Sequence, residues 1–329
     1  MIIESAFLPT PWLHNPHCQT LWAGVVRPSP ALPLVRERIE LPDGDFVDID
    51  WHQSDARSRH GPVVVIMHGL TGSIESNYAR GQMKALHALG CRVVLMNFRG
   101  QSGEPNRLPR SYHSGDTGDI DFLVRLLKQR EPDTPIAVVG YSVGGNVLLK
   151  WLGEQGDAAP VVTGVAVSPP FDLTKCAIAI NQGFSRIYQK KLLKELCATV
   201  LEKFASLETP PFALPDLDAL DDFFLYDDAI TAPLNGFRDV THYYNDSSSI
   251  HYLNAIRKPA LVIHAVDDPF MSPDIVPSEA QLSPQVTIEL SQRGGHVGFV
   301  AANRFGAPRY WLEQRIPAYL ADCFGLPQP

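Results

Sequence analysis

Long apolar runs are missing from this sequence, and no window approaches the roughly 18 apolar residues that a membrane-spanning helix needs. The first residues, "MIIESAFLPTPWLHN", lack the basic start and the continuous apolar segment of a signal peptide. The 5 cysteines are odd in number, scattered and without CxxC spacing, which argues against both a disulfide framework and a zinc ribbon. Together these absences predict a protein of a reducing, cytoplasmic compartment.

Runs of lysine and arginine are also missing, and the 329 residues carry a formal net charge of -8. A negative net charge without clustered basic residues offers no binding surface for a polyphosphate, so nucleic acid is not expected as a partner. The chain is 45% hydrophobic and 19% charged, which is enough to bury a large core. We expect one large α/β domain, or one such domain with an insertion, while the oligomeric state is not readable.

Short apolar runs alternate with helical patterns through the first half of the chain. Residues 35–52 predict a hairpin that turns at Pro42-Asp43-Gly44. Four buried strands are then expected, at 62–69, 91–98, 136–140 and 161–168, with helices between them. This strict alternation predicts a mostly parallel sheet flanked by helices.

The alternation stops at Pro169-Pro170 and returns near residue 256. Residues 171–255 show helical patterns and no convincing strand. Buried-strand character returns at 258–268 and within 285–296, and 309–324 reads as a closing helix. We therefore predict an α/β core made of residues 1–170 and 256–329. Residues 171–255 would form a helical cap inserted before the late strands.

The motif Gly140-Tyr141-Ser142-Val143-Gly144 matches the pattern G-x-S-x-G between an apolar strand and a helical segment. Side chains larger than glycine two residues either side of the serine would collide with the neighbouring strand or helix in a sharp strand-to-helix turn. Such a turn lifts Ser142 above the carboxyl end of the sheet, as a nucleophile requires. The alternative interpretation is a glycine-rich turn with a solvated serine.

A serine hydroxyl needs a base and an acid that orients the base. "RGGHVGF" places His296 in a loop after the last strand, and "HAVDDPF" places two carboxylates after the preceding strand. The order Ser…Asp…His favours Asp268, which precedes proline and an apolar residue; Asp267 remains the alternative acid or a supporting partner. His296 could also be a structural loop histidine.

Negative charge on a tetrahedral intermediate requires two backbone N–H donors. Val143, directly after the serine, would give one, and Leu70 in "MHGLTGS" would give the other. His68 and Gly69 would shape that loop, and we assign His68 no role in proton transfer.

The stretches "NPHCQT", "HGLTGS", "NFRGQSGEPNRLPRSYHSGDT", "GYSVGGN", "HAVDDPF" and "GGHVGF" together resemble the YheT-like branch of the α/β-hydrolase superfamily. That branch includes ABHD-type serine esterases and lipases and yeast medium-chain ester synthases. The resemblance spans nearly the whole chain. It implies an α/β-hydrolase fold and a serine carboxylic ester hydrolase with Ser142, Asp268 and His296 as its triad, but it does not fix a substrate.

In "HNPHCQT", the residues His14, His17 and Cys18 could be metal ligands, but their spacing matches no closed zinc set. We expect instead that Asn15, His17 and Gln19 order the loops beside the active site by hydrogen bonds.

The stretch "RLPRSYHSGD" contains Arg107, Arg110, Tyr112 and His113, which could grip an anionic headgroup. The favoured interpretation is a rigid loop whose arginines pair with Asp116 or Asp119.

The sequence thus predicts an ester hydrolase that forms an acyl-enzyme on Ser142 and requires no metal or organic cofactor. Its partners would be small ester or lipid substrates, such as short- to medium-chain acyl esters or monoacylglycerol-like lipids. Phe223, Phe224 and Tyr226 of the cap would line an acyl pocket or simply pack the cap onto the core. Two alternatives are an acyltransferase that uses the same triad on an alcohol acceptor, and a non-catalytic ligand-binding homologue.

Overall fold

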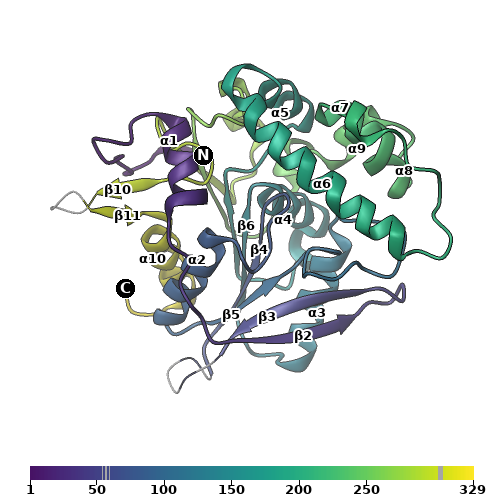
Figure 1. Cartoon of the computed structure of the whole chain (residues 1–329). Helices are drawn as coiled ribbons and strands as arrows, with labels where there is room; N and C mark the ends of the chain where they lie inside the picture. Colours follow the sequence, from purple (N-terminus) through teal and green to yellow (C-terminus); the bar gives the residue numbers. More distant parts are fainter. Residues whose placement is uncertain (54, 56–57, 59, 303–306) are drawn as a thin grey trace.

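The computed structural model describes residues 1–53, 55, 58, 60–302 and 307–329 (Figure 1). In this part of the chain one nine-stranded sheet has the order β1-β9-β8-β7-β6-β4-β5-β3-β2. Neighbours from β1 to β5 pair in parallel, whereas β3 pairs antiparallel with both β5 and β2. The strands are Ile2–Glu4 (β1), Leu34–Glu40 (β2), Phe46–His52 (β3), Val63–Met67 (β4), Arg92–Met96 (β5), Ile136–Tyr141 (β6), Thr163–Val167 (β7), Ala260–Ala265 (β8) and Val286–Ser291 (β9).

Helices cover both faces of the sheet, because successive strand residues point to opposite sides. Val63, Val65 and Met67 pack into one cluster with α3 (Gly118–Arg130) and α4 (Val143–Gln155). Val64 and Ile66 of the same strand pack into a second cluster with α2 (Asn77–Ala88) and α10 (Leu312–Phe324). The predicted doubly covered sheet is therefore confirmed.

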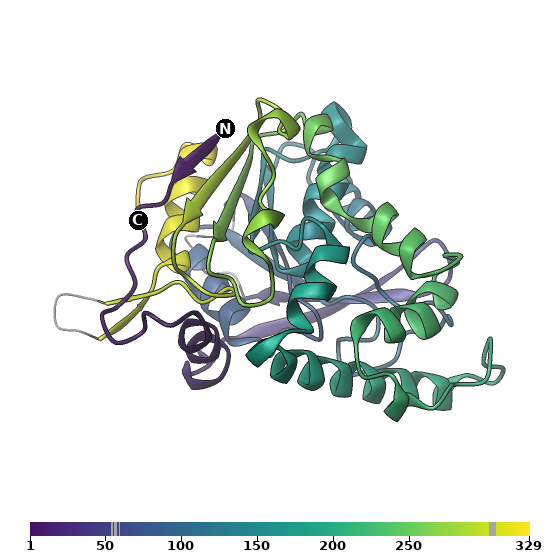
Figure 2. The same cartoon turned by 90° about the horizontal axis from the view of Figure 1, so that it is seen from above.

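Between β7 and β8 the chain forms helices and no strand. We call residues 171–255 the cap segment. Its main helices are α5 (Leu173–Ile180), α6 (Arg186–Ser206), α7 (Phe223–Tyr226), α8 (Ala232–Leu234) and α9 (Val240–Ser247). These helices share an apolar cluster of their own, and they lie over one end of the sheet (Figures 1 and 2).

Three elements differ from the sequence-based expectation. The short strand β1 was not expected, and it extends the sheet beside β9. A small hairpin of β10 (Val300–Ala302) and β11 (Pro308–Tyr310) was also missed. The closing helix was predicted from residue 309 but begins at Leu312, because residues 308–310 pair with 300–302. Within the described residues no helix is both long and apolar enough to cross a bilayer.

Candidate active site

Ser142 lies on a sharp turn between β6 and α4. Its backbone has φ 51° and ψ -119°, a conformation that non-glycine residues adopt only where the surroundings enforce it. A Cβ at Gly140 would lie 2.2 Å from the carbonyl oxygen of Gly144, and one at Gly144 would lie 2.6 Å from that of His68. The two glycines are thus required by close backbone contacts, as predicted for a nucleophile elbow.

His296 and Asp268 complete a hydrogen-bonded row with Ser142. The distance from His296 Nε2 to Ser142 Oγ is 3.0 Å, and that from His296 Nδ1 to Asp268 Oδ2 is 2.8 Å. A carboxylate oxygen accepts from Nδ1, so Nε2 is left with the lone pair that can take the serine proton. Both side chains are buried, and the ring of Phe270 stacks on the imidazole at 4.0 Å. The three residues that the sequence singled out are therefore adjacent.

The neighbouring carboxylate, Asp267, makes a different contact. Its Oδ1 accepts a hydrogen bond from the backbone N–H of Gly295 at 2.9 Å, and burial raises its pKa. Asp268 instead faces the imidazole and also accepts from the Phe270 amide at 2.8 Å. The geometry thus favours Asp268 as the partner of His296, with Asp267 as a support of the histidine loop.

The loop after β4 lies directly against the serine turn. A Cβ at Gly69 would be 3.1 Å from the Cβ of Ser142, so this loop approaches as closely as glycine allows. His68 Nδ1 lies 2.7 Å from the Gly69 carbonyl, and its Nε2 accepts from the Phe98 amide at 3.1 Å. Burial lowers the pKa of His68 to about 4, so the ring is neutral and both its nitrogens are engaged. This matches the expectation that His68 shapes the loop and transfers no proton.

Two tyrosines hold the amides on either side of Leu70. The Gly69 N–H donates to the Tyr78 hydroxyl at 2.8 Å, and the Thr71 N–H donates to the Tyr112 hydroxyl at 3.0 Å. The Leu70 amide and the first amide of α4, Val143, have no acceptor among the described residues. Two unpaired donors beside a serine oxygen are what a developing oxyanion requires. The sequence did not indicate that Tyr78 and Tyr112 would hold this loop.

We predict that Tyr112→Phe lowers kcat about tenfold while KM changes little, because the Thr71 amide loses its acceptor and the loop carrying Leu70 shifts. The measurement is steady-state hydrolysis of a p-nitrophenyl ester. Tyr243→Phe is the matched control, since this tyrosine also lines the cavity but its hydroxyl bonds Ser114 instead. Equal kcat losses in both variants would contradict a positioning role for Tyr112.

The "NPHCQT" segment lies in α1 (Pro16–Leu21) and supports the histidine loop as expected. Asn15 caps the helix, and Gln19 bonds both the amide and the carbonyl of Val300 at 2.7 and 3.0 Å. Thr20, which sequence reasoning missed, accepts from the His296 backbone N–H at 2.9 Å. His17 Nδ1 lies 3.2 Å from the Tyr188 hydroxyl. Among the described residues, His17 belongs to no group of three or more His, Cys, Asp or Glu side chains that could hold a metal ion.

The arginines of the "RLPRSYHSGD" loop form ion pairs, as expected, but one expected partner was wrong. Arg110 pairs with Asp116 at 2.8 Å, as expected, whereas Arg107 pairs with Glu40 on β2 rather than with Asp116 or Asp119. Asp119 is taken by Arg99 in a buried ion pair at 2.6 Å. Desolvation lowers the pKa of His113 to about 3, so this ring carries no charge to hold an anion.

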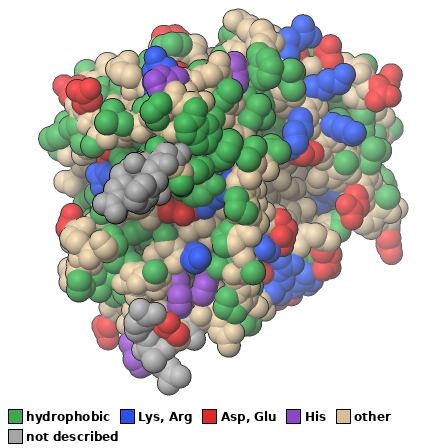
Figure 3. All heavy atoms as spheres, turned by 60° about the vertical axis from the view of Figure 1, so that its left-hand side comes forward, with side chains coloured by type: hydrophobic (Ala, Val, Ile, Leu, Met, Phe, Trp, Pro, Cys, Tyr) green, Lys and Arg blue, Asp and Glu red, His purple; other side chains and the backbone are tan. Residues whose placement is uncertain are grey.

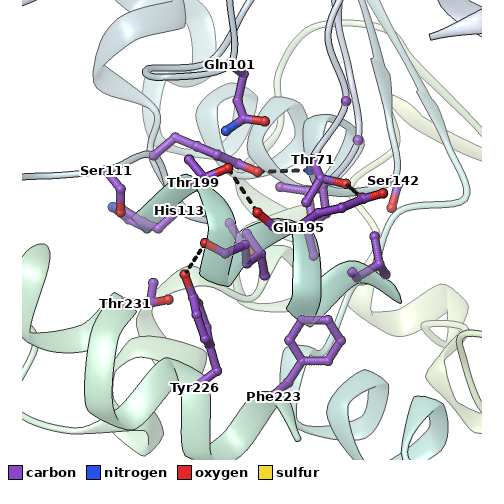
Figure 4. A pocket seen from close by; sticks show the side chains of 18 of the residues that line it. Thr71, Gln101, Ser111, His113, Ser142, Glu195, Thr199, Phe223, Tyr226 and Thr231 are labelled. Atoms are coloured by element: carbon purple, nitrogen blue, oxygen red, sulfur yellow. Dashed lines mark hydrogen bonds between the residues drawn. The ribbon is translucent and has the colours of Figure 1, made fainter. Parts of the chain in front are cut away.

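A cavity of about 510 Å³ contains Ser142 and His296 in its wall. Figure 4 shows that side chains reach it from core loops, such as Thr71 and Ser111, and from cap helices, such as Glu195 and Phe223. Phe223 and Tyr226 line the cavity as the sequence suggested. Phe224 does not belong to the lining; its ring packs edge-on against Tyr244.

Comparisons with known proteins agree with this architecture. The family model described as the alpha/beta hydrolase fold matches residues 62–302. The Escherichia coli (strain K12) protein YheT, provisionally named an esterase, is 42% identical over 318 residues, covering 96% of this chain and 93% of its own. A monoacylglycerol lipase of Saccharomyces cerevisiae is 29% identical over 266 residues, covering 79% of this chain and 59% of its own.

Among solved structures, the Pyrococcus furiosus esterase Pf2001 superposes with a TM-score of 0.57 at 19% identity, covering 89% of this chain and 94% of its own. This likeness concerns the fold alone. The sheet order, the serine turn and the extended similarity to YheT together place the chain: it belongs to the α/β-hydrolase family, in its YheT-like branch.

Proposed function

We propose that this protein is a carboxylic ester hydrolase that acts through an acyl-enzyme on Ser142. The observation that carries the proposal is the row of Ser142, His296 and Asp268, joined at 3.0 and 2.8 Å, next to the unpaired amides of Leu70 and Val143. The similarity to YheT, provisionally named an esterase, supports the same reaction class.

In the first half of the reaction, His296 Nε2 takes the hydroxyl proton while Ser142 Oγ attacks the ester carbonyl carbon. The carbonyl oxygen becomes an oxyanion that accepts from the Leu70 and Val143 amides. Collapse of this intermediate breaks the bond to the alcohol oxygen, which leaves with the proton from His296. A water molecule then attacks the acyl-enzyme through the same base, and the carboxylic acid is released. Asp268 holds the imidazole in the required tautomer throughout.

The cavity suits an acyl chain of modest length. Its volume of about 510 Å³ lies within the range of small-molecule sites, and most of its cap-side wall is apolar. The cap residues in that wall include Leu173, Ala177, Ile180, Leu192, Leu196 and Phe223. We infer that short- to medium-chain acyl esters or monoacylglycerol-like lipids are the substrates, and the similarity to a yeast monoacylglycerol lipase supports the lipid class.

The cap segment acts in this proposal as a lid over the site. One hydrogen bond joins it to the loop of Leu70, from the Thr71 hydroxyl to Glu195 on α6 at 2.7 Å. This contact is drawn in Figure 4. Since Phe223 and Tyr226 also lie in the buried cluster of the cap, they serve both the cavity wall and the packing of the cap helices.

We predict that Ala177→Phe shifts the substrate preference toward shorter acyl chains. Ala177 on α5 is buried and lines the cavity, so a ring at this position removes space that a longer chain would occupy. The ratio of kcat/KM for p-nitrophenyl octanoate to that for the acetate should fall about tenfold. The control is Ile178→Phe. Ile178 follows Ala177 on the same helix, but its side chain is 49% exposed. An unchanged ratio in Ala177→Phe would exclude this wall as the acyl site.

A series of p-nitrophenyl and glycerol esters of increasing chain length tests the proposal itself. Turnover within the series is expected; folded protein that binds these esters without turning any of them over would be a ligand-binding homologue instead. Product analysis with added ethanol separates hydrolysis from acyl transfer, since an acyltransferase would form the ethyl ester in preference to the acid.

A further inference from the structure

Apolar side chains are exposed on the outside of α1, on the helical turn η1 (Trp22–Val26) that follows it and at the start of α6. Val25 is 71% exposed and Ile187 is 59% exposed, values unusual for branched aliphatic residues. Figure 3 shows hydrophobic side chains gathered on the face that carries α1. The exposed residues of this face are Trp12, Leu21, Val25, Val26, Phe184 and Ile187, and we call them the apolar rim.

The two parts of the apolar rim lie next to each other although they come from distant parts of the chain. The ring of His17 on α1 lies 4.5 Å from that of Phe184, and its Nδ1 lies 3.2 Å from the Tyr188 hydroxyl on α6. Figures 1 and 2 both show α1 beside the first turns of α6. Residues 6–26 contain no Asp, Glu, Lys or Arg, so this segment itself brings no such charged side chain to the surface.

Basic side chains border the apolar rim on the outer face of α6. Arg186, Lys190, Lys191 and Lys194 are all exposed, and helical spacing brings them to the same side as Ile187. Of these four, Lys191 pairs with Glu195 at 2.7 Å, and the other three have no carboxylate partner in the described chain. A cationic face is notable on a chain with a formal net charge of -8, and it forms only when the helix brings separated residues together.

This surface borders the opening of the cavity. Gly24, next to Val25, and Lys191, next to Lys190, both belong to the lining of the cavity that contains Ser142. Gly24 and Lys191 are themselves exposed, so they mark one place where the cavity meets the surface. If an apolar phase lay against the rim, a lipid could pass from that phase into the cavity with little exposure of its acyl chain to water.

We propose that the apolar rim and the basic face of α6 bind an anionic lipid surface and present the cavity opening to it. An apolar patch inserts at the boundary between headgroups and acyl chains, while neighbouring lysines and arginines contact the lipid phosphates. A second copy of this chain fits less well, because a two-fold contact through this surface would bring basic faces close together. Lipid binding of this kind needs no turnover, so it holds or fails independently of the ester hydrolase proposal.

Co-sedimentation with vesicles tests this proposal directly. The protein is mixed with phosphatidylcholine vesicles that contain either no phosphatidylglycerol or about one-third of it. We expect binding to the anionic vesicles, and binding should weaken in high salt because the phosphate contacts are screened. Ser142→Ala should bind equally well, since the serine lies inside the cavity.

The double variant Val25→Glu and Ile187→Glu should lower binding to anionic vesicles at least about tenfold, through lost apolar insertion and added negative charge. Val35→Glu is the control with the same type of substitution. Val35 is 54% exposed on β2, a strand that lies away from α1 (Figure 1). Circular dichroism establishes that each variant is folded.

Two results would overturn the proposal. One is folded wild-type protein that does not sediment with anionic vesicles. The other is a double variant that binds as tightly as Val35→Glu. If ultracentrifugation instead shows a wild-type dimer that the double variant abolishes, with no vesicle binding by either, the surface is a contact between two copies and the lipid proposal is wrong.

Discussion

Ser142→Ala is expected to lower kcat/KM for p-nitrophenyl esters by about 10⁴-fold or more, because no other hydroxyl lies 3.0 Å from His296 Nε2 in the described chain. What remains would come from the Leu70 and Val143 amides and from substrate binding. The loss should appear in kcat, since the serine oxygen acts in the bond-forming step. His296→Ala should have an effect of similar size, because the two residues act as a unit.

Labelling with a fluorophosphonate probe tests the nucleophilic role of Ser142 without a substrate. Wild-type protein should form one covalent adduct, and Ser142→Ala should form none. Ser111→Ala is the matched control: this serine also lines the cavity but lies outside the row with His296, so labelling and turnover should persist. Full labelling of folded Ser142→Ala would rule out Ser142 as the nucleophile.

Asp268→Asn is expected to lower kcat about 10⁴-fold while the protein remains folded. The amide can donate to His296 Nδ1, which would turn the imidazole into the tautomer that has no lone pair at Nε2. Ser142 would then face an N–H instead of a base. The measurement is kcat across neutral pH for an ester of the preferred chain length.

Asp267→Asn provides the comparison at the adjacent position. Its side chain accepts from the Gly295 amide, and an asparagine oxygen can make the same hydrogen bond. We expect a loss below about tenfold, in line with a support of the histidine loop. If Asp267→Asn were the more damaging change, the roles of the two carboxylates would have to be exchanged.

Local patterns predicted the parts of the site that depend on adjacent residues. The turn at Ser142 follows from glycines that the backbone contacts at Gly140 and Gly144 require, and these lie within five residues of one another. Asp268 and His296 could be located because each follows a late strand, and parallel strands bring their carboxyl ends to one edge. The apolar strands were predicted for the same reason, since burial on both faces demands a continuous run.

Contacts between distant segments escaped prediction. Thr20 and His296 are 276 residues apart, and no local signal marks a threonine as the acceptor for a histidine-loop amide. Tyr78 and Tyr112 act through single hydroxyl contacts whose partners are set by packing. The strand β1 is only three residues long, and it becomes a strand because β9 offers it a parallel edge. Arg107 likewise pairs with Glu40 on β2, and not with Asp116 or Asp119, which are nearer to it in the sequence.

The bond between Thr20 and His296 bears on how far this protein can be shortened. The region shared with the family model, residues 62–302, contains Ser142, Asp268 and His296 and could be mistaken for a minimal enzyme. A chain cut to that region would lose the anchors supplied by Gln19 and Thr20, and with them the support beneath the histidine loop. The boundaries of the working unit therefore lie well outside the span that carries its chemistry, and any shortened form should begin before α1.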